Sequence, residues 1–348
     1  MLEWKKFGEV CAVHTGSQLN RSDMLEKGTY PVINGGKAPS GYTETRNEIA
    51  KNITISQGGE SAGFVNWIDT DFWAGAHCYV VENDESVFVK RFLYHYLKNI
   101  ESDLQSSKQG AGIPGLNRKV LYNHIVPIPS LSEQSRIVSI LDTFTDSIDN
   151  LKQQIEQRRK QYGHYRDQLL NFEGKEGVEM KMLNEFSKVL RGKRLTKNLL
   201  DDNAPYPVFH GGIEPLGKYG NYNREANSVM VINVGASAGT VGFCECRFWS
   251  SDGCFCISHS ELFNNKFLYY YLQTKTHYLQ SQVRHAGIPT LDNPVIERLL
   301  IPLLTLREQT RIVSILDTFE SSIANLEEQL KLREKQYEYY RNKLLTFE

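Results

Sequence analysis

Apolar residues recur at alternating spacings of four and three in two long stretches of the chain, from Ile137 to Phe172 and from Ile312 to Phe347. A sustained alternation of this kind is typical of a coiled-coil seam, because it keeps the apolar stripe on one side of the helix. The pattern therefore predicts two long helices, over residues 131–173 and 306–348. The residues expected at the seam are Ile137, Leu141, Phe144, Ile148, Leu151, Ile312, Leu316, Phe319, Ile323 and Leu326.

One seam position in each helix carries a cation instead, Arg158 in the first and Arg333 in the second. We expect these side chains to reach solvent along their stems or to pair with a helix carboxylate; the alternative is a role in setting the helix register. Both helices have the same start signal, Ser130 with Glu133 and Thr305 with Glu308, which fits a capping box.

The two helices belong to a duplication that spans the chain. RIVSILDTF occurs at residues 136–144 and again at 311–319. The segments around it, 112–173 and 287–348, align without a gap and are identical at more than half of their positions. A repeat this long is a domain, so the chain is predicted to be globular–helix–globular–helix. Each helix can bury its stripe on its duplicate, in an antiparallel coiled-coil rod with internal pseudo-twofold symmetry.

The globular parts combine short β-type runs, such as NITIS and SVMVINV, with Gly, Asn and Ser turns. One helix is expected in each, over residues 89–104 and 265–280. The fold class is therefore α+β, with two mixed α/β domains separated by the long helices. The Gly-rich runs QGGESAG and VGASAG lack phosphate-loop spacing, and we interpret them as turns.

Composition narrows the function classes. The net charge of −1 argues against a strongly basic nucleic-acid binder, but the charge is uneven: residues 1–130 give 13 − 14 = −1 and residues 180–305 give 13 − 10 = +3. Any electrostatic affinity for DNA must then come from local patches or from partner subunits. There is no run of apolar residues long enough to span a membrane and no signal-peptide pattern at the start. We expect a cytoplasmic protein with reduced thiols.

No catalytic or metal constellation emerges. Cys244 with Cys246 and Cys254 with Cys256 could hold zinc, but the first copy has only Cys78 at the matching places, so no metal is predicted. The loop of amino-methyltransferases is absent, as are HExxH and GxSxG, and no convincing nuclease core is found. No catalytic or cofactor-binding residue is therefore expected.

The repeated junctions HIVPIPSLSEQSRIVSILDTF (residues 124–144) and LLIPLLTLREQTRIVSILDTF (299–319) resemble the specificity subunit of type I restriction–modification enzymes. The similarity covers essentially the whole chain; the second copy departs at Leu304, where the first has Pro129, which affects only the loop into the helix.

That resemblance implies target-recognition domains over residues 1–130 and 181–305, each reading one half of a split double-stranded DNA site. It implies spacer helices over 131–173 and 306–348, joined by a linker at 174–180, that fix the distance between the half-sites. Two methyltransferase subunits would carry S-adenosylmethionine and methylate adenine, and restriction and translocase subunits would use ATP and Mg²⁺ to cleave. This chain would be non-catalytic, bind no cofactor and contact no membrane.

The base-reading residues cannot be transferred from the family, so the candidates rest on chemistry alone: cationic and amide side chains on polar loops. For any single one, an ordinary solvated charge is the alternative. They are Lys37, Arg46, Lys51, Gln57, Lys108 and Gln109 in the first domain and Lys193, Arg194, Lys197, Lys218, Arg224 and Arg284 in the second. Two other functions stay open: a self-contained DNA methyltransferase or nuclease, and a coiled-coil adaptor that binds only proteins.

Overall fold

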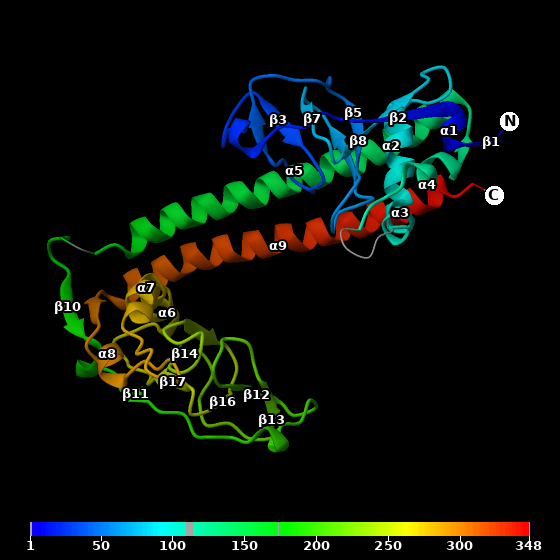
Figure 1. Ribbon diagram of the computed structural model, residues 1–348. Coiled ribbons are helices and arrows are strands. Elements are labelled where there is room, and N and C mark those ends of the chain that lie inside the picture. Colours follow the sequence, from blue (N-terminus) through cyan, green and yellow to red (C-terminus); the bar gives the residue numbers. More distant parts are fainter. Residues whose placement is uncertain (1, 109–113, 173, 348) are drawn as a thin grey trace. The chain divides into compact units, whose positions relative to one another are not determined.

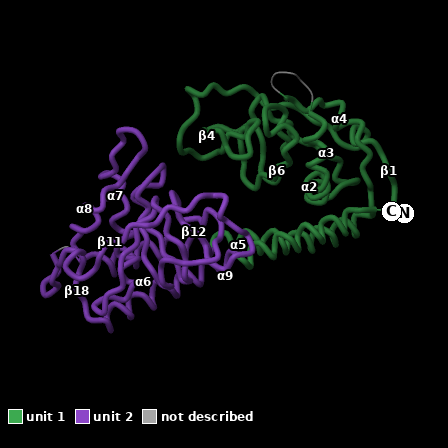
Figure 2. Tube along the Cα trace, turned by 90° about the horizontal axis from the view of Figure 1, so that it is seen from below, with its two compact units in different colours: residues 1–153, 328–348 green, residues 154–327 purple. Residues whose placement is uncertain are grey.

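The computed structural model describes residues 2–108, 114–172 and 174–347. The chain forms two compact units (Figure 2). Unit 1 consists of residues 1–153 and 328–348, and unit 2 of residues 154–327. Each unit therefore combines one globular domain with parts of both long helices, whereas the boundaries predicted from the sequence assign each helix as a whole.

Outside the long helices, the described residues of unit 1 form three small sheets and four short helices (Figure 1). Strands β1 (Glu3–Lys6) and β9 (Ile125–Ile128) pair antiparallel. The larger sheet has the order β2 (Cys11–Thr15), β8 (Cys78–Asn83), β5 (Asn52–Ser56) and β6 (Val65–Ile68), all antiparallel. The third has the order β4 (Gly41–Thr43), β3 (Tyr30–Ile33) and β7 (Trp73–Ala74). The helices are α1 (Phe7–Val10), α2 (Lys90–Asn99), α3 (Glu101–Ser106) and α4 (Arg118–Asn123), and a 3-10 turn, η1, spans Arg21–Asp23.

Unit 2 repeats this topology. Its two-stranded sheet is β10 (Glu179–Met182) with β18 (Leu300–Leu303), and its four-stranded sheet has the order β11 (Val189–Leu190), β17 (Cys254–Ile257), β14 (Ser228–Ile232) and β15 (Val241–Cys244). The three-stranded sheet has the order β13 (Gly217–Tyr219), β12 (Tyr206–Phe209) and β16 (Trp249–Ser250). The short helices are η2 (Leu183–Glu185), η3 (Lys197–Leu199), α6 (Asn265–Thr274), α7 (Thr276–Ser281) and α8 (Asn293–Glu297). The duplication seen in the sequence is thus confirmed strand by strand.

The single helix expected in each globular part is wrong, because two helices with a break between them are present. The break falls at Ile100 in unit 1, with φ −94° and ψ 11°, and at Lys275 in unit 2. The break directs α3 and α7 onto two glycines of positive φ, Gly63 and Gly239. A Cβ at Gly63 would lie 2.8 Å from the backbone nitrogen of Gln105, so only glycine permits this approach. The repeated Ser-Ala-Gly sequence therefore marks a helix-packing site.

The long helices are α5 (Leu131–Leu170) and α9 (Leu306–Leu345), and their apolar residues enter the cores of both units. Ile137 and Leu141 are fully buried in the core of unit 1, where Leu345 joins them. Ile312 and Leu316 are buried in the core of unit 2 together with Leu170. The start of each helix therefore packs on its own domain, and the end of the other helix completes that core.

Phe144 and Phe319 meet the opposite helix, as predicted from the seam. The Phe144 ring stacks on Tyr340 with a centroid distance of 5.2 Å, and Phe319 stacks on Tyr165 at 5.4 Å. These pairs are equivalent under the duplication, and they make the pairing antiparallel within each unit.

The two seam arginines also pack on these rings. Arg333 lies over Phe144 at 5.7 Å and Arg158 over Phe319 at 5.8 Å. Of the two outcomes expected, carboxylate pairing is not found among the described residues; both arginines are partly exposed and make a cation–π contact with an aromatic face.

Gln134 and Gln309, the glutamines of the repeated Glu-Gln dipeptide, have the same structural role at the start of each long helix. Both side chains are fully buried. The Gln134 amide accepts from the Val89 N–H at 2.8 Å and donates to the carbonyls of Val87 at 2.8 Å and Pro129 at 2.9 Å. Gln309 makes the three matching bonds in unit 2. Each glutamine thus fastens the long helix to the segment that leads into the first helix of its domain.

Replacing Gln134 by Ala is expected to lower the free energy of unfolding by about 2–3 kcal/mol, because it leaves a buried N–H and two carbonyls without their partner. Urea unfolding measures the loss. Gln153→Ala, at an exposed position of the same helix, is the control and should stay within about 0.5 kcal/mol of the parent protein. Equal curves for both variants would contradict this role of the buried amide.

Phe144→Ala and Phe319→Ala are expected to cost about 1–3 kcal/mol each. Both rings are half-buried, so the loss falls below the ~3–5 kcal/mol of a fully buried phenylalanine. Thermal unfolding of the two variants checks this, with Asp146→Ala at an exposed helix position as the control. An unchanged melting temperature in both phenylalanine variants would show that the paired rings do not hold the helices together.

Candidate nucleic-acid interface

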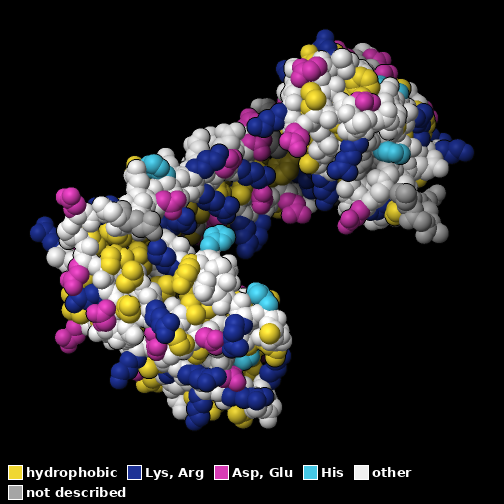
Figure 3. Space-filling view, turned by 60° about the vertical axis from the view of Figure 1, so that its left-hand side comes forward, with side chains coloured by type: hydrophobic (Ala, Val, Ile, Leu, Met, Phe, Trp, Pro, Cys, Tyr) yellow, Lys and Arg dark blue, Asp and Glu magenta, His cyan; other side chains and the backbone are white. Residues whose placement is uncertain are grey.

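Unit 2 carries a run of cations on one exposed segment. Between residues 188 and 197 the sequence holds five cations and no acidic residue, and all five side chains are exposed. Among the described residues, none of these side chains has a hydrogen-bond, ion-pair or ring partner. We call residues 188–197 the basic segment; its cations are Lys188, Arg191, Lys193, Arg194 and Lys197. Figure 3 shows Lys and Arg side chains gathered around the lower part of unit 2.

The backbone of the basic segment is held in place although its side chains are exposed. The Lys193 N–H donates to the Ser250 carbonyl at 2.9 Å, and the Trp249 indole N–H donates to the Lys193 carbonyl at 2.8 Å. At Gly192 a Cβ would overlap the Ser251 carbonyl, so only glycine lets the segment cross strand β16 this closely. The cations therefore project from a fixed backbone, which limits the ordering that binding would require.

Arg224, a predicted DNA contact, lies under this segment. Its guanidinium donates at 2.7 Å to the carbonyl of Arg191 and at 2.7 Å to that of Asn223. Its Nε is buried without a partner among the described residues. With two donors on backbone carbonyls, Arg224 helps to position the basic segment, and its assignment to DNA stays a prediction.

The matching segment of unit 1, residues 12–21, has the same frame and different side chains. The Trp73 indole donates to the Ser17 carbonyl at 3.0 Å, as Trp249 does to Lys193. A Cβ at Gly16 would likewise overlap a backbone carbonyl, that of Ala74. Gln18 and Arg21 are exposed here, and Arg21 is the one cation of the segment. Equivalent backbone thus presents mostly uncharged side chains, two amides among them, in unit 1 and five cations in unit 2.

The other predicted contacts of unit 1 have varied surroundings. Arg46 is ion-paired with Asp71, Lys108 donates to the Glu60 carbonyl at 2.9 Å, and Lys37 lies 5.8 Å from the centre of the Phe64 ring. Lys51 is exposed with φ 56°, and Gln57 is half-buried with its backbone bonded to His77 and Leu116. Gln109 lies outside the described residues. The assignment of these residues to DNA stays a prediction.

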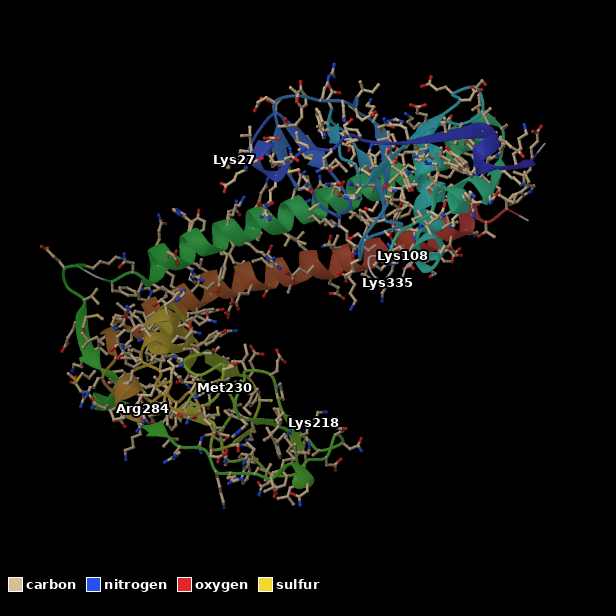
Figure 4. The ribbon with its side chains drawn as sticks, in the orientation of Figure 1. Lys27, Lys108, Lys218, Met230, Arg284 and Lys335 are labelled. Carbon is tan, nitrogen blue, oxygen red and sulfur yellow. The ribbon has the colours of Figure 1, made fainter. Side chains whose placement is uncertain are left out.

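In unit 2, Lys218 and Arg284 come from different elements. Lys218 is exposed on β13, and Arg284 lies in the loop between α7 and α8, where it pairs with Asp292 at 2.8 Å (Figure 4). Lys193, Arg194 and Lys197 belong together in the basic segment. Three of the six predicted residues of this domain thus share one segment by their sequence positions, and the other three lie on different elements.

The prediction did not include Lys188, Arg191, Gln18 and Asn20, which lie on these two segments and are further candidates. Aligning the copies could have found them, because Gly16 and Gly192 match and fix the register of the segments around them.

The cysteine pairs of unit 2 lie close together. The Cys244 and Cys246 thiols are 3.7 Å apart, and burial raises the pKa of Cys244 to about 12. The chain's described parts contain no group of three or more His, Cys, Asp or Glu placed to hold a metal ion. No helix within residues 2–108, 114–172 and 174–347 is long and apolar enough to cross a membrane.

Known structures share this fold. The chain aligns over its full length with 97% of the type I restriction–modification S subunit from M. genitalium, with a TM-score of 0.79 at 19% sequence identity. A chain from a study of complex assembly and conformational transition in a type I R-M system covers 99% of this chain, with a TM-score of 0.57.

Sequence relatives and a family match agree with the fold. A putative type I restriction enzyme specificity subunit of Haemophilus influenzae is 29% identical and covers 99% of this chain and 96% of its own length. The EcoR124I/EcoR124II specificity subunit of Escherichia coli is 26% identical over 99% of this chain and 94% of its own length. The type I restriction modification DNA specificity domain matches residues 1–158 and 175–333. The chain therefore belongs to the family of type I restriction enzyme specificity subunits, and its role in DNA recognition follows from that membership.

Proposed function

We propose that this specificity subunit reads a two-part double-stranded DNA site, one part with each unit, and directs adenine methylation by partner methyltransferase subunits. The observation that carries the proposal is one repeated scaffold with different exposed side chains at equivalent positions. Residues 12–21 and 188–197 share their backbone anchors, Trp73 and Trp249, but differ in charge. Two similar readers with different contact surfaces suit two different half-sites.

The two segments also divide the chemistry of DNA binding. Amide side chains such as Gln18 and Asn20 can bond base edges, whereas the cations of the basic segment suit phosphate oxygens. Phosphate contacts would give unit 2 the larger share of the salt-dependent affinity. The specificity subunit family is known as a non-catalytic component of these enzymes. In this proposal, S-adenosylmethionine, ATP and Mg²⁺ therefore bind to partner methyltransferase and restriction subunits.

Methylome sequencing of cells that carry this chain with its methyltransferase tests the proposal. The expected result is one adenine-methylated motif with two defined halves and an unread spacer between them. A motif without a spacer, or methylation that is unchanged when the chain is absent, would overturn it. Incubating the purified chain alone with DNA and S-adenosylmethionine addresses the rival enzyme function, for which we expect no methyl transfer.

A further inference from the structure

Each unit is built from both halves of the chain, which we define as residues 1–173 and 174–348. In unit 1, Phe347 of the second half packs on Phe92 of the first, with ring centroids 6.3 Å apart. In unit 2, Phe172 of the first half packs on Phe267 of the second at 6.5 Å. The two contacts are equivalent under the duplication. Each half therefore contributes an apolar helix end to the other half, and each has the same apolar surface on which the other's helix end packs.

These apolar contacts would form equally well between the two different halves and between two copies of one half. Phe144 stacks on Tyr340 in unit 1, and the residue that matches Tyr340 in the first half is Tyr165. In a pair of two first halves, Phe144 would meet Tyr165 of the second copy and form the same stack. Two second halves would likewise place Phe319 against Tyr340.

The charged residues that flank the seam do distinguish them. Lys152 pairs with Glu334 at 3.8 Å in unit 1, and Arg159 pairs with Glu327 at 2.6 Å in unit 2. The duplication aligns Lys152 with Glu327 and Arg159 with Glu334, so the signs are reversed between the halves.

In a pair of two first halves, Lys152 would face Arg159 of the second copy, and in a pair of two second halves Glu327 would face Glu334. All four flanking pairs would then be repulsive, whereas those within the chain are attractive.

We propose that these flanking charges form an interaction surface that selects the complementary half of the chain and rejects a second copy of the same half. Under the proposed function, the rejected pairs would present one reading surface twice and recognise a symmetric site. The selection itself rests only on the helix contacts, so it stands or falls independently of DNA recognition.

The test uses the folded full chain with a protease site inserted in the exposed turn at residues 174–177 and cut after purification. Tagged and untagged cut proteins are mixed, unfolded in urea and refolded together, and native mass spectrometry counts the complexes. Exchange of tagged for untagged halves reports that mixing occurred. We expect complexes of two first halves to be depleted about tenfold relative to random pairing at low salt, since each exposed pair contributes only a small free energy. The depletion should be smaller at high salt, because salt screens exposed charges.

The matched variant is Lys152→Glu with Glu334→Lys. It keeps both pairs within the chain attractive, but it also makes the flanking pairs of like halves attractive. In two first halves the new carboxylate at position 152 would face Arg159, and in two second halves the new ammonium group at position 334 would face Glu327. Local effects of the new charges on their own helices are the same in every pairing. We expect this variant to approach random pairing. Equal depletion in the variant and the parent protein would overturn the proposal.

A second measurement needs no refolding of separated halves. In the intact chain, Lys152→Glu alone should lower the melting temperature, and adding Glu334→Lys should restore it. Arg159→Glu with Glu327→Lys should behave in the same way. If the double variants were as destabilised as the sum of their single changes, the flanking pairs would have no coupling and the selection would be excluded.

Discussion

Exchanging residues 1–130 for the corresponding domain of a relative is expected to change one half of the methylated sequence completely and to leave the other half unchanged. Each candidate recognition surface lies in its own copy of the duplication, and the basic segment of unit 2 is held by hydrogen bonds with Arg224, Trp249 and Ser250, which all belong to unit 2. Methylome sequencing of cells that carry the hybrid chain and its methyltransferase gives both halves directly.

The contacts of α9 in unit 1 set the boundary for this exchange. His95 on α2 bonds the Tyr337 hydroxyl at 3.2 Å, and the Asn99 side chain accepts from Arg341 at 3.2 Å. A donor domain that lacks these partners would weaken unit 1. A narrower exchange of residues 11–86 keeps α2 in place and is the control for folding. If both halves of the motif changed in this narrower hybrid, the two units would not read independently.

Removing three cations from the basic segment is expected to weaken DNA binding by the assembled methyltransferase about 100-fold near 0.1 M salt. The variant is Lys193→Ala, Arg194→Ala and Lys197→Ala. Each lost phosphate contact removes about 0.9 from the slope of log affinity against log salt, so that slope should fall by up to about three. The backbone of the segment is held by Trp249 and Ser250, and the fold should therefore persist.

A variant of equal charge change separates this local effect from net charge. Lys27, Lys331 and Lys335 are exposed cations outside the basic segment, without a partner among the described residues (Figure 4 labels Lys27 and Lys335). Replacing all three by Ala should leave the salt slope nearly unchanged. The interface assignment would be wrong if both triple variants lost affinity equally, or if the basic-segment variant bound DNA as the parent protein does.

The sequence was informative about features that depend on neighbours along the chain or on its repeat. The alternation of four and three predicted both long helices, because contacts on one helix face join residues three and four apart. The duplication predicted two similar domains, since the same order of residues forms the same sheets. The repeated Ser-Ala-Gly and Glu-Gln sequences were visible too, but their roles at Gly63 and Gln134 appeared only with the packing.

The tertiary structure decided features that join distant residues. Whether a cation is available for DNA depends on what lies beside it: Arg46 meets Asp71, 25 positions away, and Arg224 meets the Arg191 carbonyl, 33 positions away. No local pattern distinguishes these arginines from Arg194, which is exposed without a partner among the described residues.

Contacts between distant residues also account for the helix break at Ile100 and for the way each unit combines parts of both long helices. The sequence by itself determined the repeated elements and the family. The fold determined which side chains are free to bind, because the partners of a charged group are set by through-space distance, which cannot be read from separation along the chain.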